Sequence, residues 1–124
     1  MSLSPELLEL IQQHIDSVET LEILLLLQRT PETFWTASAI ESHLGLKSGT
    51  AERLLSNLEQ RRLLVAGMSG GYRYNPNDDA ARRDVIAELA TAYAGRRGEV
   101  INALYSANLT RLRAFSDAFK MRNE

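Results

Sequence analysis

The fold is decided by residues 34–74, which are FWTASAIESHLGLKSGTAERLLSNLEQRRLLVAGMSGGYRY. The stretch opens with a short aromatic and β-branched patch that suits an edge strand. Thr36 then stands where it can cap a short helix over 37–44, and Gly45 follows where a left-handed helix end is favoured. Ser48 is the predicted cap of a second helix. We therefore expect two short helices that meet at a glycine turn.

The last third of this stretch predicts a β-hairpin. Residues 63–68 are apolar and partly β-branched, which is typical of a strand, and residues 72–74 supply a returning strand. Between them, Ser69, Gly70 and Gly71 form a predicted tight turn. The hairpin ends at Asn75 and Pro76.

Two helices are expected before this stretch. Ser4, Pro5 and Glu6 form a helix start, because serine caps the first turn, proline needs no partner there and an acid suits the helix dipole. This helix should end near His14. A second helix, capped by Asp16 or Ser17 and stopped by Thr30 and Pro31, has leucines on more than one face. It is predicted to be the central core helix.

Residues after Pro76 are expected to be almost entirely helical. Asn77 or Asp78 is the predicted cap, and an apolar stripe then runs as far as Tyr105. Gly95 and Gly98 interrupt the stripe, but each glycine costs only about 1 kcal/mol relative to alanine, so we expect no break there. A last helix should begin after residues 106–108.

The composition predicts a single compact domain. The chain has 124 residues, of which 44% are hydrophobic and 24% charged. It contains no cysteine, which excludes disulfides, thiolate metal sites and cysteine nucleophiles. Its first residues lack the pattern of a signal peptide, and the apolar run Leu21 to Leu27 is too short to cross a membrane. We expect a cytoplasmic protein with no membrane partner.

The charge pattern argues against a protein that coats nucleic acid without regard to sequence. The formal net charge is −2. Residues 1–30 hold five acidic residues and one basic residue, so the negative charge is concentrated at the N-terminus. Any contact with DNA must therefore come from a few well-placed side chains.

The order helix, short strand, helix, glycine turn, helix and hairpin resembles the winged helix-turn-helix domain of small bacterial transcriptional regulators, MarR-type ones among them. The resemblance covers roughly residues 17–76, a little under half of the chain. It implies a mainly α fold with a small β-hairpin wing and additional N- and C-terminal helices. We accordingly expect an N-terminal helix in 1–16, the winged domain in 17–76 and a helical extension in 77–124 that mediates dimerisation.

The resemblance implies a regulator that binds double-stranded DNA in a sequence-specific way as a homodimer. Its recognition helix, about 48–62, should enter the major groove, and the wing, 69–73, should meet the backbone or the minor groove. With Leu54, Leu55 and Leu58 turned inward, the small, polar and basic residues face outward. The candidate DNA-binding residues are Lys47, Ser48, Thr50, Arg53, Asn57, Gln60 and Arg73.

Each candidate suits a particular DNA contact. Arg53 can bind guanine through two hydrogen bonds, and the amides of Asn57 and Gln60 suit adenine. The hydroxyls of Ser48 and Thr50 suit phosphates, as do Lys47 and Arg73. Glu52 opposes the assignment, because a carboxylate repels the DNA backbone.

An alternative is a winged-helix protein that does not bind DNA and serves as a protein interaction or regulatory scaffold, since fold alone does not fix function. An exposed polar helix face is equally ordinary in such a protein. Two arrangements are also open for the apolar residues after Pro76. Part of them can fold back on the first helix around Leu7, Leu8, Leu10 and Ile11, and the rest can form a twofold interface between two copies.

No pattern of residues indicates an enzyme, a cofactor or a metal site. His14 and His43 lack the spacing of metal ligands, no serine lies in a Gly-x-Ser-x-Gly turn, and the turn at Ser69 lacks the lysine of a phosphate-binding loop. Trp35 is expected to pack against the hairpin rather than stack on a base. The sequence leaves the operator, the direction of regulation and any small-molecule effector open.

Overall fold

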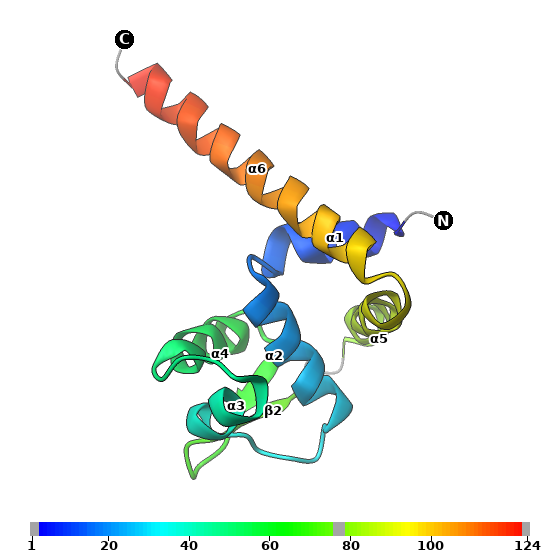
Figure 1. Cartoon of the computed structure of the whole chain (residues 1–124), viewed down its shortest axis with the longest axis vertical. Coiled ribbons are helices and arrows are strands. Elements are labelled where there is room, and N and C mark those ends of the chain that lie inside the picture. Colours follow the sequence, from blue (N-terminus) through cyan, green and yellow to red (C-terminus); the bar gives the residue numbers. More distant parts are fainter. Residues whose placement is uncertain (1–2, 76–78, 123–124) are drawn as a thin grey trace.

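The computed structural model describes residues 3–75 and 79–122, with side chains as far as residue 114. The described residues form six helices and one two-stranded antiparallel sheet. Figure 1 shows α2 in the middle of the molecule, with α4 to its left, α3 and the hairpin below it and α6 projecting away at the top. The elements in chain order are α1 (Pro5–His14), α2 (Val18–Arg29), α3 (Ala37–Leu44), α4 (Thr50–Gln60), β1 (Leu64–Ala66), β2 (Tyr72–Tyr74), α5 (Ala80–Gly95) and α6 (Arg97–Arg122).

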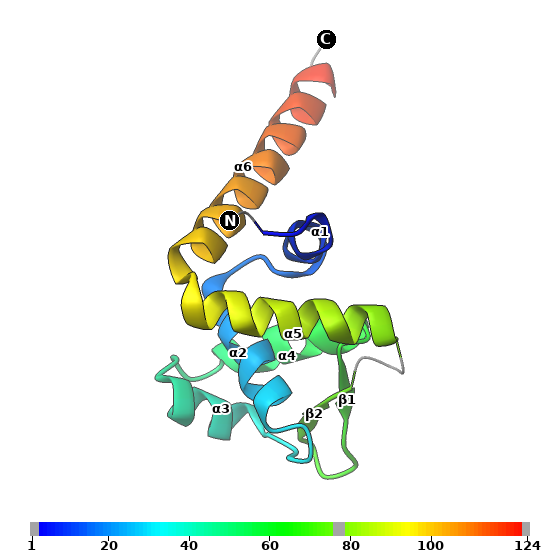
Figure 2. The ribbon, with the colours of Figure 1, turned by 90° about the vertical axis from the view of Figure 1, so that its right-hand side faces the viewer.

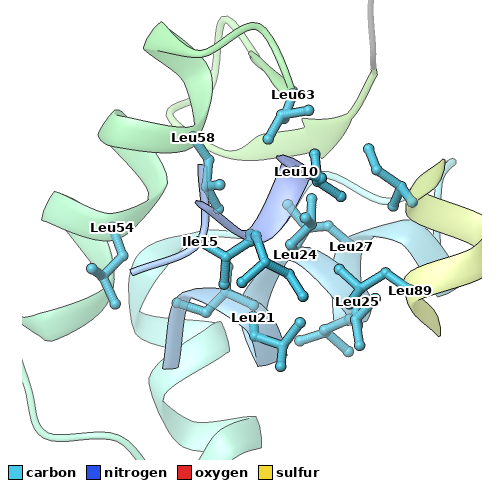
Figure 3. Packing of buried hydrophobic residues seen from close by; sticks show 14 of the residues in the cluster. Leu10, Ile15, Leu21, Leu24, Leu25, Leu27, Leu54, Leu58, Leu63 and Leu89 are labelled. Carbon is cyan, nitrogen blue, oxygen red and sulfur yellow. The ribbon is translucent and has the colours of Figure 1, made fainter. Parts of the chain in front are cut away.

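Helix α2 is the centre of the core, as predicted. Ser17 caps it by accepting a hydrogen bond from the Thr20 amide at 3.1 Å, and seven of its 12 residues are buried. In Figure 3, Leu21, Leu24 and Leu27 of α2 lie among leucines of other elements. These neighbours include Leu54 and Leu58 of α4, Leu63 before β1 and Leu89 of α5.

The turn between α3 and α4 follows the prediction at one end and departs from it at the other. Thr36 caps α3, and Gly45 ends it in the left-handed conformation with φ 71°. Ser48, however, does not cap α4. The chain turns at Gly49, which has φ 91°, so the helix begins at Thr50 and its capping residue has no side chain. Because Arg61 leaves the helical conformation, α4 also ends earlier than the predicted 62.

The predicted hairpin and its edge contact are confirmed. Leu64 pairs with Tyr74 and Ala66 with Tyr72. The expected edge strand is reduced to one bridge, in which Trp35 and Tyr72 exchange backbone hydrogen bonds of 2.7 and 2.8 Å. Trp35 is half-buried and its ring nitrogen donates to the Thr30 hydroxyl at 2.9 Å, so its predicted structural role holds.

The helices after the hairpin break at a different place from the one predicted. Asp79 caps α5, whereas the predicted caps Asn77 and Asp78 lie outside the described residues. Helix α5 ends at Gly95, and Arg96 is non-helical with ψ 52°, so the glycines are not passed without a break. Helix α6 then continues through residues 106–108, where we expected a break. The side-chain amide of Asn108 donates to the Asp16 carbonyl at 3.2 Å, which connects α6 to the segment between α1 and α2.

Helix α1 packs against α5 and α6, which confirms that the extension folds back on the N-terminus. Figure 2 shows α5 running across the molecule, with the hairpin below it and α1 and α6 above. Leu7, Leu10 and Ile11 are buried in this layer. The Ser4 hydroxyl donates to Glu88 of α5 at 2.8 Å, and the Arg111 guanidinium of α6 donates to the Ile11 carbonyl at 3.0 Å.

A cluster around His14 joins this layer to the end of α4. The two ring nitrogens of His14 lie 3.4 Å from the guanidinium nitrogens of Arg61 and Arg82. Arg61 also donates to the Gln13 carbonyl, and Arg82 donates to the Arg61 carbonyl at 3.0 Å. Burial lowers the pKa of His14, and the charges of Arg82 and Arg61 act in the same direction. The folded protein therefore favours the neutral ring.

We expect His14 to make the fold less stable in mild acid. In the unfolded chain the ring binds a proton near its ordinary pKa of 6.5, whereas the folded state resists protonation. The unfolded state then holds more protons, so the free energy of unfolding falls as the pH drops below about 6.5. The His14→Gln variant lacks this term and should lose less stability between about pH 7.5 and pH 5 in urea unfolding. Parallel pH profiles for the two proteins would contradict the assignment.

Candidate nucleic-acid interface

Helix α4 has one buried face and one polar face, as its sequence predicts. Ala51, Leu54, Leu55 and Leu58 are buried against the core. Arg53 is exposed on the opposite side, whereas Thr50 and Asn57 are half-buried. Since residues three and four apart lie on the same side of a helix, these three polar side chains share one face.

The predicted site residues cluster at the N-terminal end of α4. Lys47 and Ser48 are exposed in the turn directly before the helix, next to Thr50 and Arg53. At the other end, Gln60 is exposed but stands beside Arg61, whose guanidinium is held against α1. The free end of α4 is therefore its first half, which is the part of a recognition helix that meets base edges.

The carboxylate of Glu41 caps α4 in place of the missing side chain at Gly49. Its Oε2 accepts a hydrogen bond of 3.0 Å from the Ala51 amide, across the turn from α3. This bond links α3 to the start of α4 and places a negative charge at a helix end that otherwise attracts phosphate. Positive charge for a DNA contact must then come from Lys47 and Arg53. No local sequence pattern predicts this contact, because Glu41 and Ala51 are ten positions apart.

Glu52, whose charge opposes DNA binding, has a structural role. Its Oε1 accepts a hydrogen bond of 3.2 Å from the Tyr72 hydroxyl, which connects the exposed side of α4 to β2. Burial raises the pKa of Tyr72, and the neighbouring Glu52 charge raises it further. The hydroxyl therefore stays protonated and remains a donor, so that Glu52 holds the wing against α4.

Arg73 does not extend from the tip of the wing. It lies in β2 opposite Val65 and is half-buried, with its guanidinium carbon 5.1 Å from the centre of the Phe34 ring. Arg73 therefore belongs to a different element from the six candidates on and before α4. The tip itself exposes Met68 completely, together with Ser69 and Gly70. Met68 was not singled out in the sequence, where only its position before the turn marks it.

Both histidines contact side chains that do not bind metals. His43 packs edge-on against the Trp35 ring at 5.4 Å between centroids. Among the described side chains, in 3–75 and 79–114, no three His, Asp or Glu side chains come together in a way that would hold a metal ion. In the same part of the chain, no helix is both long and apolar enough to span a bilayer.

A three-helix unit with a glycine turn before its exposed helix and a hairpin behind it defines a winged helix-turn-helix domain. Residues 19–66, from α2 to the end of β1, match the model of the IclR helix-turn-helix domain. The chain thus contains a DNA-binding domain of the type found in transcriptional regulators. The predicted resemblance is confirmed at this level, while the MarR type is not confirmed. Neither the curated proteins nor the solved structures contain a match to the chain.

We expect Glu41→Ala to destabilise the domain by about 1 kcal/mol, because the Ala51 amide loses its acceptor at the start of α4. Glu41→Gln keeps an acceptor oxygen without the charge and should cost less. Ser42→Ala, at an exposed neighbouring position, is the matched control. Urea unfolding measures all three, and equal midpoints for Glu41→Ala and Ser42→Ala would show that the cap contributes nothing.

Proposed function

We propose that this protein is a sequence-specific DNA-binding transcriptional regulator that acts as a dimer and inserts α4 into the major groove. One observation supports this function above all others. The helix-turn-helix domain presents Arg53 on the exposed face of α4, while the opposite face is buried in the core. An arginine in this position matches the commonest specific contact with guanine.

The other candidates receive roles according to where they lie. Lys47, Ser48 and Thr50 surround the start of α4 and suit phosphate contacts, which set the position of the helix on DNA. Asn57 lies one turn after Arg53 and suits adenine. Gln60 and Arg73 are the weaker candidates, because Gln60 adjoins the contact with α1 and the Arg73 guanidinium lies against Phe34.

The three predicted segments keep their proposed roles. We assign 17–76 to the DNA-binding unit with its wing at 69–73, 1–16 to an N-terminal helix, and 77–124 to a helical extension that mediates dimerisation. This division follows the packing of α1 against α5 and α6 rather than against the polar face of α4. The function requires no catalytic residue, cofactor or metal.

Fluorescence anisotropy against native-promoter and random duplexes tests the DNA contacts. Arg53→Gln should weaken binding to a selected duplex by about 5- to 150-fold and relax the preference at one base pair, because a bidentate contact is worth about 1–3 kcal/mol. Lys47→Gln should weaken binding to all duplexes alike and reduce the salt slope by about one.

Arg113→Gln is the control, since this exposed arginine lies on α6 outside the domain. Its duplex binding should equal that of the wild type. If Arg53→Gln and Arg113→Gln bind the selected duplex equally well, Arg53 does not read a base. Absence of wild-type binding even at low salt would overturn the proposed function.

Dimerisation is proposed through α6 and the neighbouring face of α1. Tyr105, Leu109 and Leu112 recur on one side of α6 with 69%, 53% and 61% of their surfaces exposed. The helix has 26 residues, a length of about 39 Å, and projects beyond the rest of the molecule (Figure 1). Leu8 of α1 is also exposed and lines a surface hollow together with Ala103 and Ala107 of α6. A second copy that pairs with these residues would bury them.

Leu109→Asp should raise the dimer dissociation constant at least tenfold, because a carboxylate would replace an apolar side chain in the interface. Ala114→Asp, at another exposed position of α6, is the matched control and should have little effect. Sedimentation equilibrium gives both constants. A wild-type protein that stays monomeric at about 100 μM would contradict this interface.

A protein-interaction scaffold is the second candidate, and the same apolar stripe on α6 favours it. Under this function α6 would receive a different protein, and the polar face of α4 would have no nucleic-acid partner. The duplex titration separates the two candidates. Failure of the wild type to bind DNA, together with capture of a partner that Leu109→Asp abolishes, would establish the scaffold.

A further inference from the structure

The turn between β1 and β2 carries a large apolar side chain that touches nothing else in the protein. Met68 is fully exposed, and Phe34, which packs beside the turn, leaves 49% of its surface exposed. Figure 1 and Figure 2 both show the turn at the lower end of the molecule, away from α6. A single exposed apolar residue is ordinary, so its meaning depends on how the turn is built and on what surrounds it.

The backbone that carries Met68 is held firmly in place. The Gly67 amide donates to the Gly71 carbonyl at 2.7 Å, and the Gly70 amide donates to the Gly67 carbonyl at 3.2 Å. Phe34 packs against Gly67 and Gly71, and a Cβ at Gly67 would lie only 2.7 Å from its ring. The turn is therefore fixed to the body of the domain, while the Met68 side chain extends into solvent.

The turn is also narrow. Met68 is followed by Ser69, Gly70 and Gly71, so no bulky side chain stands next to it on this side. Gly70 has φ 90°, a conformation that favours glycine and keeps the tip free of a larger residue. The minor groove of B-DNA is only about 6 Å wide, and a tip made of serine and glycine can approach its floor.

The charge of the hairpin suits DNA. Residues 63–75 contain no acidic residue and one basic residue, Arg73. Its guanidinium carbon lies 5.1 Å from the centre of the Phe34 ring, which places a positive charge at the base of the turn. The Tyr72 hydroxyl donates to Glu52 in the first turn of α4, so the hairpin has a fixed position relative to this helix. An apolar tip above a positive base matches a partner that combines phosphates with stacked aromatic bases.

We propose that Met68 is an apolar wedge that enters the minor groove beside the site of α4, partly separates two stacked base pairs and bends the DNA. Methionine is among the side chains that insert between base steps, and its thioether contacts aromatic rings favourably. This role rests on the proposed function, because it requires α4 in the adjacent major groove. It adds selection by deformability, since pyrimidine–purine steps such as TA unstack more easily than other steps.

The test uses the full-length protein and a selected duplex of about 25 base pairs with donor and acceptor dyes at its ends. The wild type should bend this duplex by about 20–90°, measured by energy transfer. Met68→Ser should lose most of the bend and bind about 3- to 10-fold more weakly, because the contacts of α4 remain while the inserted side chain is lost. Met68→Leu retains an apolar wedge and should retain the bend.

Two controls separate the wedge from other effects. Because the Met68 side chain is fully exposed, Met68→Ser should unfold at the same urea concentration as the wild type. Ala66→Ser makes the same change from apolar to polar at an exposed position of β1 outside the turn, and it should bend the duplex as the wild type does.

A change in the DNA provides an independent readout. Replacing a TA step on the wing side of the site by a stiff A-tract should weaken wild-type binding by at least about threefold. Binding of Met68→Ser should be equal on the two duplexes, because the variant no longer unstacks the step. Equal discrimination by both proteins would show that Met68 does not read deformability.

The outcomes distinguish the wedge from the proposed function. Duplex binding without any bend, or equal bending by the wild type and Met68→Ser, would overturn the wedge and leave DNA recognition by α4 in place. The exposed tip would then be assigned to a protein partner. Absence of wild-type binding to every duplex would overturn the proposed function and the wedge together.

Discussion

The burial of helix α2 is the constraint on which the other elements depend. Its leucines contact α3, α4 and β2, so the helix-turn-helix unit and the hairpin share one apolar support. A helix that is apolar on several sides cannot face water and must be covered all round. The cover on one side is the DNA-binding unit itself. On the other side, α5 brings Leu89 and α1 brings Leu10 to this core, and α6 packs against α1 and α5. The polar face of α4 is exposed because its opposite face is required to cover α2.

Local signals predicted the elements well where they acted alone, and failed where two signals competed. The bounds of α1 followed from Ser4 and Pro5, and the end of α3 followed from Gly45, because each depends on one residue type with a strong conformational preference. Ser48 failed as a cap because Gly49 adopts a left-handed turn and Glu41 binds the helix end from a distance. We expected the helix to continue through Gly95, because one glycine costs little helical stability. It ends there because the next residue, Arg96, has a non-helical conformation.

The candidate site also has one part that local sequence signals predict and another that depends on contacts between distant residues. Helical periodicity was sufficient to place Arg53 on the exposed face and the leucines of α4 inside. No pattern within one element shows that the Tyr72 hydroxyl donates to Glu52, or that the Arg73 guanidinium lies against the Phe34 ring. The Lys47 to Arg53 cluster is local in sequence, so the exposure of Lys47, Ser48 and Arg53 at the start of α4 could be predicted from the helical pattern alone.

The anchoring of Arg61 has a consequence for the kind of operator this protein can use. Its guanidinium fastens the end of α4 to α1, and Arg111 fastens α1 to α6. In a dimer formed through α6, each reading helix would be connected to the twofold axis by packed contacts rather than by a swinging tether. A dimer connected in this way would fit only operators with one particular separation between the two half-sites. Because DNA completes a turn in about 10–10.5 base pairs, one inserted base pair rotates the second half-site by about 35°. The two helices would then face the groove together only at the original spacing.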